Sequence, residues 1–250
     1  MENRRPLIAG NWKMFKTCPE AVETARQLAQ LVNISTVDVM IAPQFTALVP
    51  VSDVIKRGCV SLGAQNLFWE SEGAYTGEIS PAMLVSAGCR YVIIGHSERR
   101  QYFGENDDSV NKKIKAAIRD NLIPILCVGE SEKERESKET FNVLDRQITK
   151  GLEGFSSNEL DTLVIAYEPV WAIGTGKTAT KEQAQEVHRF LRSMVEKIFG
   201  NILAMSVRIL YGGSVKPDNI KELMEMPDVD GALVGGASLD AETFSKIINF

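Results

Sequence analysis

Two side chains suited to proton transfer stand where a buried apolar run meets a polar loop. Glu168 directly follows the apolar run Leu163–Tyr167, and Pro169 after it cannot extend a hydrogen-bonded strand. Burial in an apolar setting raises the pKa of a carboxyl group, and with it the basicity toward a carbon acid. Glu168 is therefore a candidate general base. A structural ion pair or a helix cap is the alternative role for an isolated glutamate at this position.

His96 occupies the matching position after another apolar run, Tyr91–Ile94. The residues Ser97–Arg100 that follow it can open a short helix, and the N-terminal amides of a helix favour a neutral imidazole. A neutral ring can donate a hydrogen bond to a substrate oxygen. The alternative is a histidine satisfied within the fold, which is the role we expect for His188 inside an amphipathic helical segment.

Asn11 and Lys13 follow the first apolar run of the chain, Leu7–Ala9. A lysine placed there can supply positive charge to a phosphate group and to an oxyanion that develops during a reaction. A solvated surface lysine is the alternative. The position directly after the first expected strand favours the substrate-binding role.

Glycines cluster after the last two apolar runs, in Gly212-Gly213-Ser214 and Gly235-Gly236-Ala237-Ser238. Without side chains, glycines let a phosphate group approach the backbone amides, and barrel enzymes commonly build a phosphate site after their last two strands. Tight turns are the alternative use of these glycines. Two such loops at these two positions favour the phosphate site.

The long segment Pro169–Thr180 predicts a mobile lid. A nucleotide P-loop is excluded, because GxxxxGK[ST] requires glycine where Trp171 stands. The GxGxxG pattern fails as well, because it requires glycine where Ala179 stands. The residues expected to give the lid flexibility, a hinge and an apolar cover are Gly174, Gly176, Thr178, Ala179 and Ile173.

Short apolar runs alternate with longer segments of helical periodicity. Runs that do not alternate with polar residues are typical of strands covered on both faces, and this favours a parallel sheet. The eight expected strands lie near Leu7–Ala9, Val39–Ala42, Ser61–Gln65, Tyr91–Ile94, Ile123–Val128, Leu163–Tyr167, Val207–Tyr211 and Gly231–Val234. Helices are expected near 18–29, opened by a Thr17–Glu20 capping box, and at 47–56, 80–87, 109–120, 138–151, 181–199, 217–224 and 241–248.

Eight such strand–helix units predict one α/β domain over residues 1–250, a (β/α)8 barrel of eight parallel strands ringed by helices. An open, doubly wound sheet is the alternative. In a barrel of this kind, the working groups lie in the loops after the carboxyl ends of the strands. The candidate residues all occupy such loops.

Composition and charge narrow the functional classes. The 250 residues carry 28 basic and 33 acidic side chains, and this net charge of −5 gives no reason to bind nucleic acid or an anionic membrane. We expect neither a signal peptide nor a membrane span, because no apolar stretch is long enough. Four scattered cysteines without a CxxC pair indicate reduced thiols and a cytoplasmic location. Two histidines without metal-binding spacing lead us to expect neither a metal nor another cofactor.

Five motifs taken together closely resemble those of triosephosphate isomerases, in order and spacing, from about Leu7 to the end of the chain. The resemblance implies interconversion of dihydroxyacetone phosphate and D-glyceraldehyde 3-phosphate, in glycolysis and gluconeogenesis. The five motifs are Asn11–Met14, Ile94–Arg100, Ala166–Gly176, Tyr211–Val215 and Gly235–Ser238.

The resemblance also implies a role for each site residue. Glu168 moves a proton between two carbons through an enediolate, while His96 polarises the substrate oxygens as electrophile and acid. Lys13 and Asn11 hold the substrate and offset its charge, and Glu98 pairs with Lys13. The phosphate-binding amides are those of Gly174, Ser214, Gly235 and Gly236. The lid and its supports are Pro169, Val170, Trp171, Ile173, Thr175, Gly176, Lys177, Thr178 and Ala179, with Glu130, Tyr211 and Ser214 holding the closed form.

Members of this family are usually homodimers. The segment Gly73–Glu78 resembles the loop that inserts into the partner subunit, with Thr76 approaching Asn11 of the other chain. Two other functions stay open: a phosphate-binding barrel acting on a larger sugar phosphate, and a barrel that only binds a partner. Short loops elsewhere in the chain argue against a roomy pocket. The joint presence of Lys13, His96 and Glu168 argues against a non-enzyme.

Overall fold

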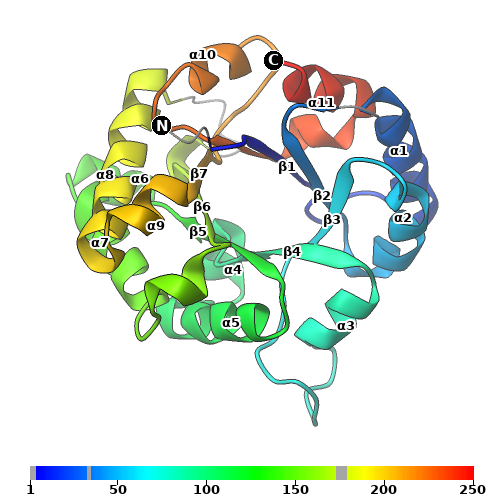
Figure 1. Cartoon of the computed structure of the whole chain (residues 1–250), viewed down its shortest axis with the longest axis horizontal. Helices are drawn as coiled ribbons and strands as arrows, with labels where there is room; N and C mark the ends of the chain where they lie inside the picture. The colour runs from blue at the N-terminus through cyan, green and yellow to red at the C-terminus, as the bar shows by residue number, and fades with distance from the viewer. Residues whose placement is uncertain (1–3, 33–34, 173–178) are drawn as a thin grey trace.

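Eight parallel strands close into a barrel in the computed structural model, which describes residues 4–32, 35–172 and 179–250. Each strand pairs with the next in chain order, and β8 returns to β1 through the pairs from Leu7↔Gly231 to Gly10↔Val234 (Figure 1). The strands are β1 Leu7–Asn11, β2 Asp38–Ala42, β3 Val60–Ala64, β4 Cys89–Ile94, β5 Ile123–Val128, β6 Val164–Tyr167, β7 Arg208–Tyr211 and β8 Gly231–Val234.

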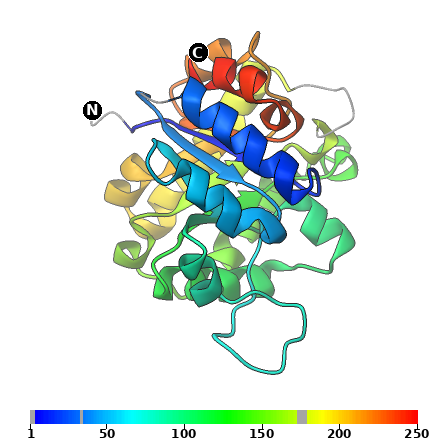
Figure 2. The same cartoon turned by 90° about the vertical axis from the view of Figure 1, so that its right-hand side faces the viewer.

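Helices surround the barrel on the outside (Figures 1 and 2). In the described parts of the chain, the α-helices are α1 Cys18–Leu31, α2 Leu48–Ile55, α3 Pro81–Ser86, α4 Ser97–Tyr102, α5 Asp107–Arg119, α6 Glu132–Glu136, α7 Thr140–Gly151, α8 Lys181–Phe199, α9 Asn201–Ser206, α10 Ile220–Met224 and α11 Ala241–Ile248. Short 3-10 turns lie at Phe45–Ala47, Ser157–Leu160, Val170–Ala172 and Gly236–Leu239.

Two apolar layers hold the barrel together, because neighbouring residues of a strand point to opposite faces. One layer fills the barrel interior and includes Leu7, Met40, Tyr91 and Leu210. The other lies between the strands and the helices and is the larger of the two. The interior is tightly filled: a Cβ on Gly63 would lie 2.5 Å from the sulfur of Met40. The barrel is therefore a packed core, and a ligand has room only at an end.

The predicted fold class is confirmed, and the doubly wound alternative is wrong because β8 pairs with β1. The predicted capping box is present, with the carboxylate of Glu20 accepting from the backbone N–H of Thr17 at 2.7 Å. Two short helices were not predicted. Helix α6 consists of charged residues without apolar periodicity, and α9 follows α8 after the single residue Gly200, whose φ of 89° interrupts the helix.

No helix among the described residues is long and apolar enough to cross a lipid bilayer. One loop departs from the barrel outline. The connection between β3 and α3 projects well beyond the body of the molecule (Figures 1 and 2), and residues 70–78 within it are all exposed.

Candidate active site

A cavity of about 380 Å³ opens at the carboxyl ends of the strands. It brings together residues from loops that are far apart in the sequence, after β1, β4, β6, β7 and β8. Of the predicted catalytic and phosphate-binding residues, those that line it are Asn11, Lys13, His96, Glu168, Ser214, Gly235 and Gly236. Gly174, the remaining one, lies outside the described residues.

Glu168 and His96 are in direct contact inside this cavity. The Nε2 atom of His96 lies 2.8 Å from Oε1 of Glu168, and the other oxygen of Glu168 accepts from the backbone N–H of Ser97 at 2.9 Å. The Nδ1 atom of His96 accepts from the backbone N–H of Glu98 at 3.2 Å, at the start of α4. A nitrogen that accepts a hydrogen bond carries no proton, so these partners assign a neutral ring with its proton on Nε2.

Both side chains are almost completely buried, His96 at 5% exposure and Glu168 at 2%. Burial raises the pKa of Glu168, as the sequence predicted, but the His96 ring and the Ser97 amide outweigh burial and hold the pKa below its ordinary value. The predicted raised pKa is therefore wrong for the resting site. At His96 burial acts in the opposite direction and lowers the pKa of the ring. The neighbouring carboxylate of Glu168 outweighs burial, so the pKa of His96 is raised. Glu168 is thus ionised at neutral pH and ready to accept a proton.

Lys13 is held at the mouth in a backbone conformation that L-residues rarely adopt, with φ at 50°. The side-chain oxygen of Asn11 accepts from the backbone N–H of Lys13 at 3.0 Å, and the Gln65 amide donates to its carbonyl at 2.8 Å. The Lys13 ammonium donates to Glu98 at 2.6 Å, the pair that the resemblance implied. These contacts fix one positive charge close to Glu168 and His96.

The two glycine-rich loops lie next to these charged groups. A Cβ on Gly212 would lie 3.0 Å from Cγ of Glu168, and one on Gly235 would lie 3.4 Å from Cε of Lys13. Nothing lies within 4 Å of a Cβ on Gly236. The open space over Gly236, where a short 3-10 turn begins, leaves room for an anion beside the backbone.

Glu130 is a fully buried carboxylate beside the start of the predicted lid. Its Oε1 accepts from the Tyr167 hydroxyl at 3.1 Å, from the Trp171 indole at 2.9 Å and from Arg135 at 3.0 Å. Pro169 and Ala179 are buried, while Val170 and Trp171 are half-buried. The predicted lid residues that lie outside the described part of the chain are Ile173, Gly174, Thr175, Gly176, Lys177 and Thr178.

Tyr211 and Thr76 do not line the cavity. Tyr211 is buried beneath the β7 loop, where a Cβ on Gly213 would lie 2.2 Å from its hydroxyl, and burial raises its pKa to about 12. Thr76 lies in the projecting loop between β3 and α3 and is exposed. In residues 4–32, 35–172 and 179–250, no group of three or more His, Cys, Asp or Glu side chains has an arrangement that could hold a metal ion.

Ser97 and Gln65 contribute to the site and were not predicted. Ser97 acts through its backbone N–H, which any residue except proline supplies, so its side chain carried no signal. Gln65 donates to the carbonyls of both Lys13 and Ala42 at 2.8 Å. A polar residue at the end of the third expected strand was the available signal for it.

The comparisons with known proteins agree with this geometry. A sequence model of the family described as triosephosphate isomerase matches residues 6–250. The chain belongs to the triosephosphate isomerase family. A triosephosphate isomerase of Geotalea uraniireducens is 55% identical over 248 residues, and one of Geobacter metallireducens is 57% identical, in each case over 99% of both chains. The crystal structure of the triosephosphate isomerase from Bartonella henselae superposes with a TM-score of 0.89 at 41% identity, over 98% of both chains.

Because the match covers the whole barrel and not a fragment, the chain is an isomerase of the triosephosphate isomerase family. Its cavity, its buried carboxylate–imidazole pair and its lysine lie on the same closed barrel that the family match covers.

Proposed function

We propose that the protein interconverts dihydroxyacetone phosphate and D-glyceraldehyde 3-phosphate, with Glu168 as the base and His96 as the electrophile and acid. The observation that carries the assignment of roles is the 2.8 Å contact between these two buried side chains in a cavity they share with Lys13. The ionised carboxylate takes a proton from one substrate carbon and returns it to the neighbouring carbon, through an enediolate.

His96 serves the substrate oxygens. Its Nε2–H points at Glu168 in the resting site, and a substrate entering between them receives that hydrogen bond on an oxygen. Departure of the carboxylate from His96 removes the larger of the two influences that raise the pKa of the ring, the smaller being Glu98, and the Glu98 amide continues to donate to Nδ1. A neutral imidazole then donates to the carbonyl oxygen as negative charge develops there.

Lys13 and Asn11 hold the substrate and offset the charge of the enediolate. The phosphate group binds the backbone amides of Ser214, Gly235 and Gly236 together with that of Gly174. The lid, from Pro169 to Ala179, closes over the bound substrate and excludes water from the enediolate. Glu98 is proposed to keep the Lys13 ammonium in place, and Glu130, Tyr211 and Ser214 to hold the lid. The contacts of Glu98 with Lys13 and of Glu130 with Trp171 support these assignments.

The full-length match to triosephosphate isomerases argues against the alternative of a larger sugar phosphate. We propose that the reaction uses no metal and no other cofactor, and that the chain is one barrel domain, located in the cytoplasm and without nucleic acid or membrane partners.

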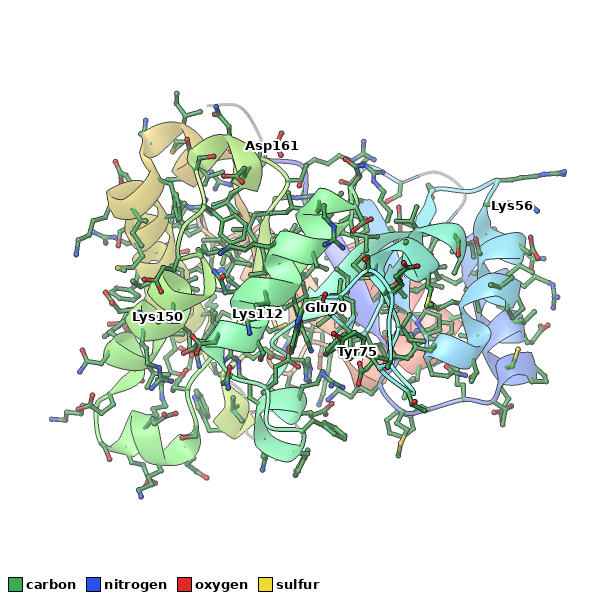
Figure 3. All side chains as sticks on the ribbon, turned by 90° about the horizontal axis from the view of Figure 1, so that it is seen from below. Lys56, Glu70, Tyr75, Lys112, Lys150 and Asp161 are labelled. Carbon is green, nitrogen blue, oxygen red and sulfur yellow. The ribbon has the colours of Figure 1, made fainter. Side chains whose placement is uncertain are left out.

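A homodimer is the proposed assembly. Two exposed apolar side chains support this assembly. Tyr75, in the projecting loop between β3 and α3, is 44% exposed (Figure 3). Met14, which directly follows Lys13, is 94% exposed. Apolar side chains exposed on and beside a projecting loop are typical of an interface. Thr76 of one chain would then approach Asn11 of the other. The mass in solution tests this, and a particle of 27.6 kDa would contradict it.

The Glu168→Gln variant tests the proposed base. The amide keeps the size of the side chain but cannot accept a proton, so kcat is expected to fall about a thousandfold or more. Coupled assays in both directions, with a metal chelator present, measure this, and binding of a phosphorylated three-carbon inhibitor should remain. A variant with full turnover would refute the role of Glu168.

A further inference from the structure

The backbone of Glu168 rests against Gly129, in the loop after β5. A Cβ on Gly129 would lie 1.8 Å from the carbonyl oxygen of Glu168, closer than any side chain could approach. On either side of this contact, the N–H of Glu168 donates to Val128 at 2.8 Å and the N–H of Val170 donates to Glu130 at 3.1 Å. The backbone of segment 128–130 therefore contacts and supports the backbone of Glu168, the proposed base.

Gly129 has no strand neighbour on its other side. Strand β4, the partner of β5 there, pairs only as far as Ile94↔Leu126, after which the chain turns through Gly95 into α4. The N–H and C=O of Gly129 lie beyond that end and would lack strand partners. Gly129 is part-buried, and unpaired backbone groups at such a position cost stability unless another group satisfies them.

Gln147 supplies both partners. This side chain reaches from α7 and is only 4% exposed. Its oxygen accepts from the Gly129 N–H at 2.8 Å, and its NH2 group donates to the Gly129 carbonyl at 3.1 Å. A carboxamide presents the same donor and acceptor as a peptide group, so Gln147 takes the place of the missing strand residue.

Open space adjoins the loop on this side. A second cavity of about 590 Å³ lies there, lined by Gln147, Gly129, Ser97 and Glu168 among others. Glu168 thus lines two cavities, one toward the substrate and one behind it. Side chains do not pack against the loop across a cavity, so the two hydrogen bonds from Gln147 restrain its position there.

We propose that Gln147 is a positioning residue for the general base: its amide fixes Gly129 and, through it, the backbone of Glu168. This inference rests on the proposed function, since it takes Glu168 to be the base. A displacement of about 1 Å in a reacting group can cost about a hundredfold in rate. Lys13 and three of the four proposed phosphate-binding groups, Ser214, Gly235 and Gly236, belong to other loops, so substrate binding should be little affected.

The Gln147→Met variant removes both hydrogen bonds at similar side-chain volume. Its kcat is expected to fall about tenfold to a hundredfold, with KM within about twofold of the parent. A matched control is Asn111→Leu, because the Asn111 amide also donates two hydrogen bonds to backbone carbonyls, those of Gly151 at the end of α7 and of Glu153 after it, both at 3.0 Å. That variant should lose stability and keep its kcat.

The Gln147→Glu variant gives a second readout that a purely structural role would not move. An ionised carboxylate accepts from the Gly129 N–H but cannot donate to its carbonyl, whereas a protonated carboxyl group can do both. The ratio of its kcat to that of the parent protein should therefore rise as pH falls. This ratio also decides the matter if Gln147→Met does not fold.

Equal kcat in Gln147→Met and Asn111→Leu, or a pH-independent ratio for Gln147→Glu, would overturn the inference. Either result would leave the proposed function untouched as long as Glu168→Gln remains inactive. Full activity of Glu168→Gln would instead remove the proposed function itself.

Discussion

The two histidines of the chain lie in two buried regions that shift the pKa of the imidazole ring in opposite directions. His96 lies at the mouth of the barrel, with Nε2 facing a carboxylate and a substrate-sized cavity. His188 lies on α8, completely buried, with Nδ1 3.1 Å from the carbonyl oxygen of Asp228. Its Nε2 has no hydrogen-bond partner among the described residues.

Burial disfavours the charged form of both rings, and their partners then separate them. At His96 the carboxylate of Glu168 outweighs burial and the pKa is raised. At His188 burial prevails over the backbone contact with Asp228, and the pKa falls to about 4. The partner of a buried histidine, more than its depth, therefore decides which charge it can carry.

The charges around the two histidines differ as well. Near His188, at the amino ends of the strands, Arg192 donates to Asp228 at 2.6 Å and to Asp230 at 2.7 Å, and Arg4 donates to Asp230 at 2.6 Å. Arg192 also donates to the carbonyls of Ala204 and Val207. This cluster satisfies its own charges internally, whereas the mouth leaves Glu168, His96 and Lys13 facing a cavity. The first arrangement suits stability, and the second is the one for which we propose a catalytic role.

Among the variants that compare these two regions, His96→Gln is expected to have the largest effect. The amide cannot act as acid and donates weakly to a developing oxyanion, so kcat should fall about a thousandfold, equivalent to about 4 kcal/mol in the barrier. Steady-state kinetics measure this loss. His188→Gln is the matched control, and its kcat should stay within about twofold of the parent. Comparable losses in the two variants would break the comparison between the regions.

Arg192→Met is expected to act on folding and not on chemistry. Removing the guanidinium leaves two buried backbone carbonyls without this donor and leaves Asp230 with Arg4 and the backbone N–H of Ile209. Breaking a buried pair in this way costs about 3 kcal/mol. Denaturant unfolding measures the change. Lys56→Met, which breaks an exposed pair with Asp53, should leave the unfolding free energy almost unchanged. An Arg192→Met protein of unchanged stability would contradict the role given to the cluster.

A smaller and pH-dependent effect is expected at His188. Its pKa is 6.5 in the unfolded chain and about 4 when folded, so between these values the unfolded state binds the extra proton. Stability should therefore fall as pH falls from 6.5 to 4, by an amount approaching roughly 3 kcal/mol. In His188→Gln this contribution is absent, and unfolding free energies measured across that range should fall less steeply. Parallel profiles for both proteins would show that His188 does not titrate as the structure indicates.

The sequence alone predicted much of the fold and of the site. Apolar runs of strand length, separated by helical segments, indicate a parallel barrel because strands covered on both faces carry no polar alternation. The same order marks the loop positions of Lys13, His96 and Glu168, since each lies one or two residues after the end of a strand. The sequence also predicted local features such as the Thr17–Glu20 capping box. It did not predict helix α6, because this charged helix has no apolar face.

Only the tertiary structure decided what these residues do to one another. The direction of the pKa shift of Glu168 depends on His96. Gln65 donates a hydrogen bond to the backbone of Lys13. Gln147 accepts one from the backbone of Gly129. Each of these pairs joins different loops or helices. Sequence periodicity reports burial and local conformation, but Coulomb interactions and hydrogen bonds depend on distances that exist only once the barrel has closed.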